Sequence, residues 1–435
     1  MTSAVEARTF NLDEWRDRSR GAWPAPTQVR VALAGCGAVG SALLRELVAR
    51  RGALAERHGV RVELTRVLVR DVTRPRDAEF DRSLLTADVD EFLATDADVV
   101  IEAIGGLDPA RRIAESVLGR GRELVTANKE LLAAHGSSLT ALAQAHRTSL
   151  RYDAAVGGGV PVLRLLDDAL GAGTPVSVRG ILNGTTNFVL TRLERGASLE
   201  DALREARAAG FAEADASRDL DGRDAAAKLS LVAWAAFGVA PEAIVVRRQS
   251  LLPDPARYAA LAARVGRSVR QVAECTVVDG AVAASVEPLL LEATSALART
   301  RDEQNRVEVH SGWSAPLCAS GPGAGGVPTA TALLSALVAT STAPRRHSGA
   351  RPGGTDPRRF AWAVEARGTS QLLHRLVSGC GLVHTDATAT CAWTIVESAA
   401  PAEIDRIVAA LVACRAEPIA VRFDDAESTG QGEWS

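Results

Sequence analysis

A glycine-rich turn between an apolar segment and a helical pattern constrains the fold of this chain more than any other feature. Residues 29–34 are apolar except for Arg30, residues 35–40 read Gly-Cys-Gly-Ala-Val-Gly, and leucine and valine then recur at helical spacing over 43–48. Between a strand and a helix, such a turn lets backbone N–H groups approach a pyrophosphate, although packing alone can also require the glycines. We expect the cofactor contacts to include Gly35, Gly37, Ala38, Val39 and Gly40.

Further apolar segments alternate with helical patterns up to about residue 150. Strands are expected at 62–69, 98–104 and 123–126. This alternation favours right-handed βαβ crossovers and a parallel sheet that is covered on both faces. The sequence therefore predicts an α/β fold whose Rossmann-type dinucleotide-binding domain spans 29–150, is completed by about 315–340 and follows an N-terminal extension at 1–28.

Beyond residue 150 the pattern changes to α+β. We expect strands at 151–156 and 176–182, and helices at 161–170, 186–195, 199–209, 222–237 and 330–338. We assign residues 151–314 to a domain for substrate binding and dimerisation. Residues 341–359 are rich in Pro, Gly, Ser and Arg and are typical of a linker.

The C-terminal residues 360–425 form a third predicted domain. Strands and helices are expected in the order βαββαβ, which is the order of a ferredoxin-like fold. The expected strands are 360–366, 382–390, 392–396 and 419–423, and the expected helices are 370–378 and 402–413.

The charge balance excludes several classes of partner. The chain has 50 basic and 53 acidic residues, a formal net charge of −3, and no uninterrupted apolar run of about 18 residues. We therefore expect neither a nucleic-acid partner nor membrane attachment. The N-terminus lacks the basic-then-apolar order of a secretory signal, and the six cysteines are scattered. These features predict a cytoplasmic protein with reduced thiols.

Lysine is almost absent from this chain. Of the 50 basic residues only Lys129 and Lys228 are lysines, and the others are arginines. An ammonium group is compact and can exchange its proton when its surroundings lower its pKa, whereas a guanidinium stays charged. Although two surface lysines can also persist by chance, we expect both residues to serve proton chemistry or close substrate contact.

The end of the second strand bears on the choice of cofactor. An acid at this point would bind a ribose 2′-hydroxyl, whereas an arginine would pair with a 2′-phosphate. Here Arg70 occupies the position directly after the expected strand, Asp71 lies one residue beyond it, and Arg74 and Arg76 follow closely. The order favours NADP over NAD, with Arg70 as the phosphate contact, although a basic loop of this kind can also be solvated.

Carboxylates are concentrated before the second lysine. If a helix begins with Asp221 as its cap, Asp224 and Lys228 lie four residues apart on one face and can touch. Such a pair on an exposed helix would be ordinary. Five acids over 213–224 before a rare lysine instead suggest a pocket that binds an ammonium through carboxylates and a hydroxyl or carbonyl through Lys228.

Seven blocks of sequence together resemble homoserine dehydrogenases, in the family's order. The blocks lie at 35–40, 125–129, 152–161, 180–188, 210–215, 221–228 and 321–330. The resemblance implies reversible hydride transfer between NAD(P)H and L-aspartate 4-semialdehyde, which gives L-homoserine in the branch leading to threonine, methionine and isoleucine. It further implies a homodimer or homotetramer.

The same resemblance implies roles for individual residues. Lys228 is similar to the family's proton donor and acceptor, and Lys129 to its second active-site lysine, beside the nicotinamide and the substrate. Other matching positions are those that hold the amino acid, Glu213, Asp219 and Asp224; two further cofactor contacts, Gly323 and Gly325; and those of a site for Na⁺ or K⁺, Asp153, Val156, Gly158 and Val160.

Some residues depart from the family pattern. Asp153 stands where glutamate is usual, the proline common after Asp215 is missing, and Arg218 adds a charge near the predicted pocket. These changes leave open an enzyme of specialised metabolism that reduces another amino-acid semialdehyde, or a catalytically silent nucleotide sensor. The C-terminal domain resembles an ACT domain but lacks the Asp-x-Pro-Gly sequence of ligand-binding copies. Two roles therefore stay open for it: feedback control by threonine, or pairing of subunits without a ligand.

Overall fold

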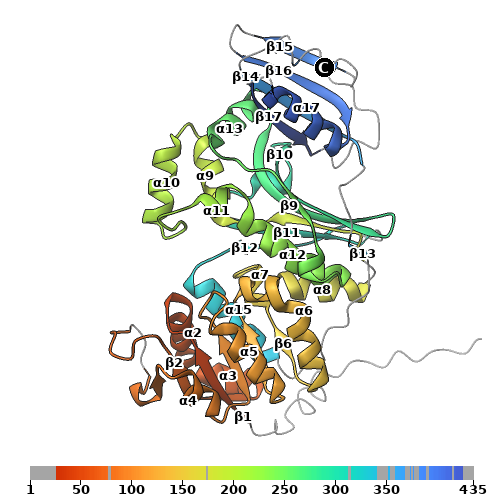
Figure 1. The fold of residues 1–435 in the computed structure, drawn as a ribbon. Helices are drawn as coiled ribbons and strands as arrows, with labels where there is room; N and C mark the ends of the chain where they lie inside the picture. Colours follow the sequence, from red (N-terminus) through yellow and green to blue (C-terminus); the bar gives the residue numbers. More distant parts are fainter. Residues whose placement is uncertain are drawn as a thin grey trace, which may run out of the picture.

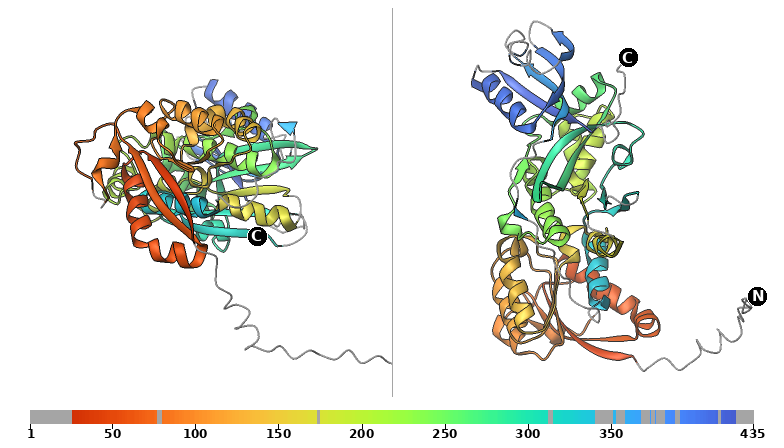
Figure 2. Two further views of the ribbon diagram at one scale, coloured as in Figure 1. Left: turned by 90° about the horizontal axis from the view of Figure 1, so that it is seen from below. Right: turned by 90° about the vertical axis from the view of Figure 1, so that its right-hand side faces the viewer.

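The computed structural model describes residues 26–76, 80–172, 175–311, 315–339, 351–352, 358–367, 373, 376, 382–387, 391–413 and 416–424. Within these residues, two sheets organise an elongated molecule, with the first sheet at one end and the C-terminal strands at the other (Figure 1). The side view in Figure 2 shows the same succession along the long axis.

The first sheet is parallel and has six strands in the order β3-β2-β1-β4-β5-β6. The order reverses beside β1, which creates the crevice where α/β sheets bind ligands. The strands are β1 (Thr27–Ala34), β2 (Val60–Leu68), β3 (Leu85–Thr86), β4 (Val99–Glu102), β5 (Glu123–Thr126) and β6 (Leu150–Arg151).

Side chains of β1 alternate between two hydrophobic cores. Val31 and Leu33 enter the core beneath α2 and α15, and Ala32 and Ala34 enter the core beneath α5 and α6. The sheet is therefore covered on both faces, as the sequence predicts. The covering helices are α2 (Ala38–Ala49), α3 (Arg51–His58), α4 (Val89–Ala94), α5 (Ala110–Gly119), α6 (Lys129–Ala145) and α15 (Gly326–Val338).

The second sheet is mixed and runs in the order β12-β11-β7-β9-β10-β17-β14-β16-β15, with β8 and β13 also paired to β10. Its central strands are β7 (Ser177–Ile181), β8 (Val246–Arg248), β9 (Ser268–Val278), β10 (Ala281–Leu291), β11 (Gln304–His310), β12 (Leu317–Pro322) and β13 (Arg351–Pro352). The helices associated with these strands are α7 (Asp153–Val156), α8 (Val162–Ala172), α9 (Gly184–Glu194), α10 (Leu199–Ala208), α11 (Ser217–Leu220), α12 (Arg223–Phe237), α13 (Pro255–Arg264) and α14 (Ala296–Arg299).

Two local predictions were wrong. The strand expected at 151–156 is restricted to β6, which ends at Arg151, and Asp153–Val156 form the helical turn α7. The cap of α12 is Gly222, at a φ of 79°, rather than Asp221. Glycine adopts this left-handed conformation without the steric cost of a Cβ, and the Asp221 carboxylate instead accepts from the N–H of Arg223 at 2.9 Å.

The C-terminal strands have the ferredoxin-like order β17-β14-β16-β15, with neighbours antiparallel. They are β14 (Phe360–Arg367), β15 (Leu382–Ala387), β16 (Cys391–Ala399) and β17 (Glu417–Phe423), accompanied by α17 (Pro401–Ala413). Most of the expected helix at 370–378, most of the linker and most of the N-terminal extension lie outside the described residues. The proposed domain boundaries remain a prediction.

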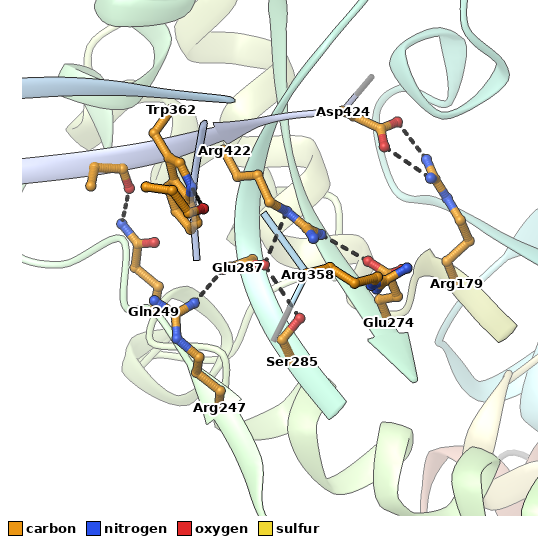
Figure 3. A network of polar contacts seen from close by, with 12 residues as sticks. Arg179, Arg247, Gln249, Glu274, Ser285, Glu287, Arg358, Trp362, Arg422 and Asp424 are labelled. Carbon is orange, nitrogen blue, oxygen red and sulfur yellow. Dashed lines mark hydrogen bonds and ion pairs between the residues drawn. The ribbon is translucent and has the colours of Figure 1, made fainter. Parts of the chain in front are cut away.

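Buried ion pairs accompany the junction between β10 and β17. Arg422 donates to Glu274 at 2.8 Å and lies 3.3 Å from Glu287, and the Arg422 side chain is only 5% exposed. Figure 3 shows Arg422 reaching towards both carboxylates, while Arg179 pairs with Asp424 at the end of β17. Buried charges are tolerated when they are paired and hydrogen-bonded, so removing one partner should be costly.

Acid should weaken this junction. Burial opposes ionisation of Glu274, but Arg422 and Arg358 favour it more strongly and lower its pKa from 4.5 to about 2. The carboxylate therefore contributes its full stability above about pH 4.5 and loses it as the pH falls towards 2. Glu274→Gln should lower the free energy of unfolding at pH 7 by about 3 kcal/mol, and its difference from the unsubstituted chain should shrink towards pH 3.

Urea unfolding at pH 7, 5 and 3 measures this difference. Glu46→Gln on α2 is the control, because Glu46 pairs with the exposed Arg50 and should change stability by less than about 0.5 kcal/mol. A difference for Glu274→Gln that stays constant over this pH range would contradict the prediction.

Candidate active site

The glycine turn after β1 is tightly packed at Gly35 and Gly40 and open at Gly37, where a Cβ would meet nothing within 4 Å. A Cβ on Gly35, whose φ is 102°, would lie 2.5 Å from the carbonyl oxygen of Ala103, and one on Gly40 would lie 2.0 Å from that of Gly35. Helix α2 begins at Ala38 without a side-chain cap, so its first N–H groups and its positive end are available to an anion. A cleft of about 860 Å³ opens here, and Gly35, Gly37 and Ala38 line it.

Arginines line the same cleft. Arg70, Arg74 and Arg76 contribute to its wall just after β2, and Arg45 contributes from α2. The carboxylate of Asp71 accepts from the hydroxyl and the N–H of Thr73, at 2.7 and 2.8 Å, and these bonds lower its pKa. Asp71 is thus engaged within its own loop.

Both lysines meet at one buried carboxylate. Lys129, the first residue of α6, pairs with one oxygen of Asp224, and Lys228 lies 2.9 Å from the other. Lys228 also donates to the carbonyl oxygen of Leu182 at 2.9 Å. The side chains of Asp224 and Lys228 are 10% and 11% exposed, whereas that of Lys129 is 31% exposed.

The pKa values of the two aspartates in this cluster are shifted in opposite directions. Burial opposes the ionisation of Asp224, but the charges of Lys228 and Lys129 and their hydrogen bonds outweigh it and hold its pKa well below the ordinary value. Burial raises the pKa of Asp219, and the neighbouring charge of Asp224 adds to this effect. Asp224 is thus a fixed negative charge, and Asp219 is a half-buried carboxyl beside it.

Two polar residues at the centre of the site were missed by the sequence analysis. Asn183 donates to Asp219 at 2.7 Å and to Asp224 at 2.8 Å. Glu102, fully buried at the end of β4, accepts from the N–H groups of Ile104 and Gly105 at 2.8 and 3.2 Å. Asn183 lies within a block of family resemblance, but its partners are 36 and 41 residues away, so no local pattern marks its role.

The Glu102 network fixes the start of α6. Asn128 caps this helix by accepting from the N–H of Leu131 at 3.0 Å, and its amide donates to the carbonyl oxygen of Gly106 at 2.7 Å. Thr126 bonds to Glu102 and accepts from the N–H of Asn128 at 3.0 Å. The turn after β4 and the position of Lys129 therefore depend on one buried set of hydrogen bonds.

Glu213 lies apart from this cluster. It is exposed on the loop between α10 and α11, and within the described residues no side-chain bond joins it to Lys129, Lys228 or Asp224. Arg218, on α11, pairs at 3.1 Å with Glu130, which follows Lys129. The unexpected charge thus forms an ion pair between α11 and α6.

The second glycine segment packs against the turn expected to hold a cation. A Cβ on Gly158 would lie 2.4 Å from the carbonyl oxygen of Gly323, and Gly325 caps α15 at a φ of 114°. Val156 ends α7, and the carbonyl oxygen of Val160 accepts from the N–H of Val162 at 2.8 Å. In the part of the chain that the structure describes, no three His, Cys, Asp or Glu side chains gather to hold a metal, so ligands here would be chiefly carbonyl oxygens.

Among the described residues, no helix combines the length and the apolar character needed to span a lipid bilayer.

Comparisons with known proteins match most of this chain. The family model "Homoserine dehydrogenase" matches residues 161–338, and "Homoserine dehydrogenase, NAD binding domain" matches residues 35–153. The homoserine dehydrogenase of Bacillus subtilis is 34% identical over 313 residues, 72% of each chain. That of Corynebacterium glutamicum is 36% identical over 332 residues, 75% of this chain and 74% of the relative.

Solved structures show the same architecture. A homoserine dehydrogenase from Thiobacillus denitrificans superimposes with a TM-score of 0.81 at 25% identity, covering 93% of this chain and all of that one. A hyperthermophilic archaeal homoserine dehydrogenase in complex with NADPH gives a TM-score of 0.58 at 23% identity, covering 72% of this chain and 98% of that one, and supports the fold alone. With the two family models covering most of residues 35–338, this chain belongs to the homoserine dehydrogenase family of NAD(P)-dependent oxidoreductases that act on a CH–OH group.

Proposed function

We propose that this enzyme interconverts L-homoserine and L-aspartate 4-semialdehyde with NADP(H), and that Lys228 is its proton donor and acceptor. The observation that carries the proposal is the meeting of the chain's two lysines at Asp224, where α6 follows the nucleotide-binding sheet. The glycine turn fits the pyrophosphate of a dinucleotide, because nothing lies within 4 Å of where a Cβ on Gly37 would be, while Gly35 and Gly40 permit the tight turn and its packing. When bound, NADP(H) supplies or accepts the hydride.

The side chains then manage charge and protons. As the aldehyde is reduced, its oxygen gains negative charge, which a nearby ammonium stabilises and then neutralises by donating a proton. Lys228 has this role in our proposal, and Lys129 lies across Asp224 from it. Asp224 compensates both ammonium charges, including that of Lys129 at the positive end of α6, where a cation is otherwise disfavoured.

Carboxylates would bind the amino group of the substrate. Asp219 and Asp224 lie next to the lysines, joined through Asn183. Glu213 is the third proposed ligand, and its exposed position requires the loop between α10 and α11 to close over the substrate.

Loss of the proton donor should slow turnover with little effect on cofactor binding. Lys228→Arg keeps the charge but cannot readily release a proton, so kcat for homoserine oxidation should fall by roughly 10²- to 10⁴-fold. Absorbance at the nicotinamide band measures the rate, and fluorescence titration measures NADPH binding. Lys228→Met provides a second test, because it removes the donor without adding guanidinium bulk.

Arg111→Lys on the exposed face of α5 is the control and should retain activity within about twofold. Wild-type activity in Lys228→Arg would overturn the assigned proton donor. An unsubstituted enzyme that binds NADPH but oxidises no homoserine would overturn the proposed substrate, and activity with another amino-acid semialdehyde would then identify a specialised relative.

The cofactor preference depends on Arg70 in this proposal. Arg70→Ser should raise KM for NADP at least about tenfold and leave KM for NAD nearly unchanged, because only NADP carries the 2′-phosphate. Arg57→Ser on α3, which does not line the cleft, is the control. Equal losses with both cofactors would contradict the assignment.

A monovalent cation is a further part of the proposal. Carbonyl oxygens of Val156, Gly158 and Val160, with Asp153 nearby, would hold Na⁺ or K⁺ and fix the turn that packs on Gly323. Replacing K⁺ and Na⁺ by choline, which is too large for such a site, should lower activity and the melting temperature at constant ionic strength. Equal behaviour in all three salts would rule out the cation.

The proposal also covers the oligomeric state and the cellular compartment of the enzyme. We propose a cytoplasmic homodimer or homotetramer, with the small amino-acid substrate as its reaction partner. Light scattering at micromolar concentration measures the assembly.

A further inference from the structure

The amide of Asn183 has a fully determined orientation. Asn183 follows β7, is 5% exposed and caps α9 by accepting from the N–H of Thr186 at 2.8 Å. Because a backbone N–H can only donate, the oxygen of the amide must face Thr186, and its NH₂ group must face the opposite way. The two hydrogens of that group are directed to one oxygen of Asp219, at 2.7 Å, and one of Asp224, at 2.8 Å.

These bonds hold two like charges close together. Two carboxylates in a half-buried site repel each other, and a donor between them offsets this repulsion only when it reaches both. The amide reaches both, and it shares with Lys228 the Asp224 oxygen that faces away from Lys129. The amide therefore helps to fix the orientation of the Asp224 carboxylate between the two lysines.

The preceding residue acts on the same cluster. The carbonyl oxygen of Leu182 accepts from Lys228 at 2.9 Å, so two consecutive residues after β7 contact the proton donor and both aspartates. Helix α9 is almost entirely buried, and so the turn has a rigid support. Small displacements at such a point can cost a large factor in rate.

We infer that Asn183 is a positioning residue, which uses its amide to hold Asp219 and Asp224 in the geometry that aligns Lys228 and the amino group of the substrate. This inference rests on the proposed function. Asn183 acts through the aspartates and needs no contact of its own with the substrate.

Two substitutions separate this role from helix capping. Serine and aspartate are both good N-caps, so Asn183→Ser and Asn183→Asp should preserve α9. Serine lacks the reach and the second hydrogen, and aspartate replaces the donor by a third negative oxygen. We expect kcat to fall roughly 10²-fold in Asn183→Ser and further in Asn183→Asp, with unchanged NADPH affinity.

The pH dependence provides a readout that a merely structural role would not move. The charged groups facing the amide are Asp219 on α11, Asp224 and Lys228 on α12, and Lys129 on α6. The bond from Asn183 favours the ionised form of Asp219, so its loss should raise the pKa of Asp219. The acid limb of kcat/KM should then move to higher pH in Asn183→Ser.

Ser198→Ala is the matched control, because Ser198 caps α10 at 3.1 Å but does not contact the cluster. It should lower the melting temperature slightly and leave kcat and the acid limb unchanged. Wild-type kcat in Asn183→Ser, or a lower kcat with an unmoved acid limb, would overturn the inference.

A separate measurement distinguishes this failure from that of the proposed function. If the unsubstituted enzyme does not oxidise homoserine, the proposed substrate is wrong. Carboxyl NMR titration of Asp219 in the unsubstituted chain and in Asn183→Ser still decides the positioning role. An upward pKa shift supports it, and identical titrations overturn it.

Discussion

The ion cluster at Asp224 is the interaction on which the catalytic architecture depends, because it joins helices that belong to different sheets. Lys129 begins α6, which follows β5 of the parallel sheet, and Asp224 and Lys228 lie on α12, beside the mixed sheet. Neither unit alone contains both ammonium groups. Burying the charges of Asp224 and Lys228 is tolerable here because Asp224 gives one oxygen to each lysine and also accepts from Asn183.

The C-terminal strands belong to the same packed body. Arg247 and Arg248 are neighbours on β8 and bind in different directions, Arg247 to Glu287 in the buried network and Arg248 to Asp221 before α12. Hydrophobic residues of α9 and α13 pack on Ile419 and Val421 of β17. A continuous series of contacts therefore links β17 to the turn that precedes Asp224.

Local patterns predicted those parts of the fold in which neighbours in sequence determine the structure. Around Gly35, an apolar run predicted the strand, the glycines predicted the turn, and a period of about 3.6 residues predicted the helix. The hairpin of β9 and β10 was missed, although its turn, Asp279-Gly280, has positive φ at both residues and is a strong signal. The prediction of a strand at 151–156 was wrong because the segment is too short for its periodicity to distinguish the strand β6 from the helical turn α7.

The site was predictable in its residue types but not in its supporting contacts. The rarity of lysine marked Lys129 and Lys228, and the spacing of four residues placed Asp224 beside Lys228. Folding determined the roles of Asn183 and Glu102, because Asn183 bonds to Asp219 and Asp224, and Glu102 bonds to Thr126 on the neighbouring strand. Glu213 shows the opposite case: its motif marks it, but its exposed loop leaves it away from the lysines.

The surroundings of the two lysines differ in whether they could accommodate arginine instead. The ammonium of Lys228 fits between a carbonyl oxygen and a carboxylate in a site where only 11% of the side chain is exposed. A guanidinium would bring five N–H groups there and leave some of them buried without acceptors, so packing alone disfavours arginine. Lys129 is 31% exposed, and a guanidinium at its position could reach water. Packing thus explains one lysine but not the other, and the second is better explained by a need for a compact cation beside the substrate.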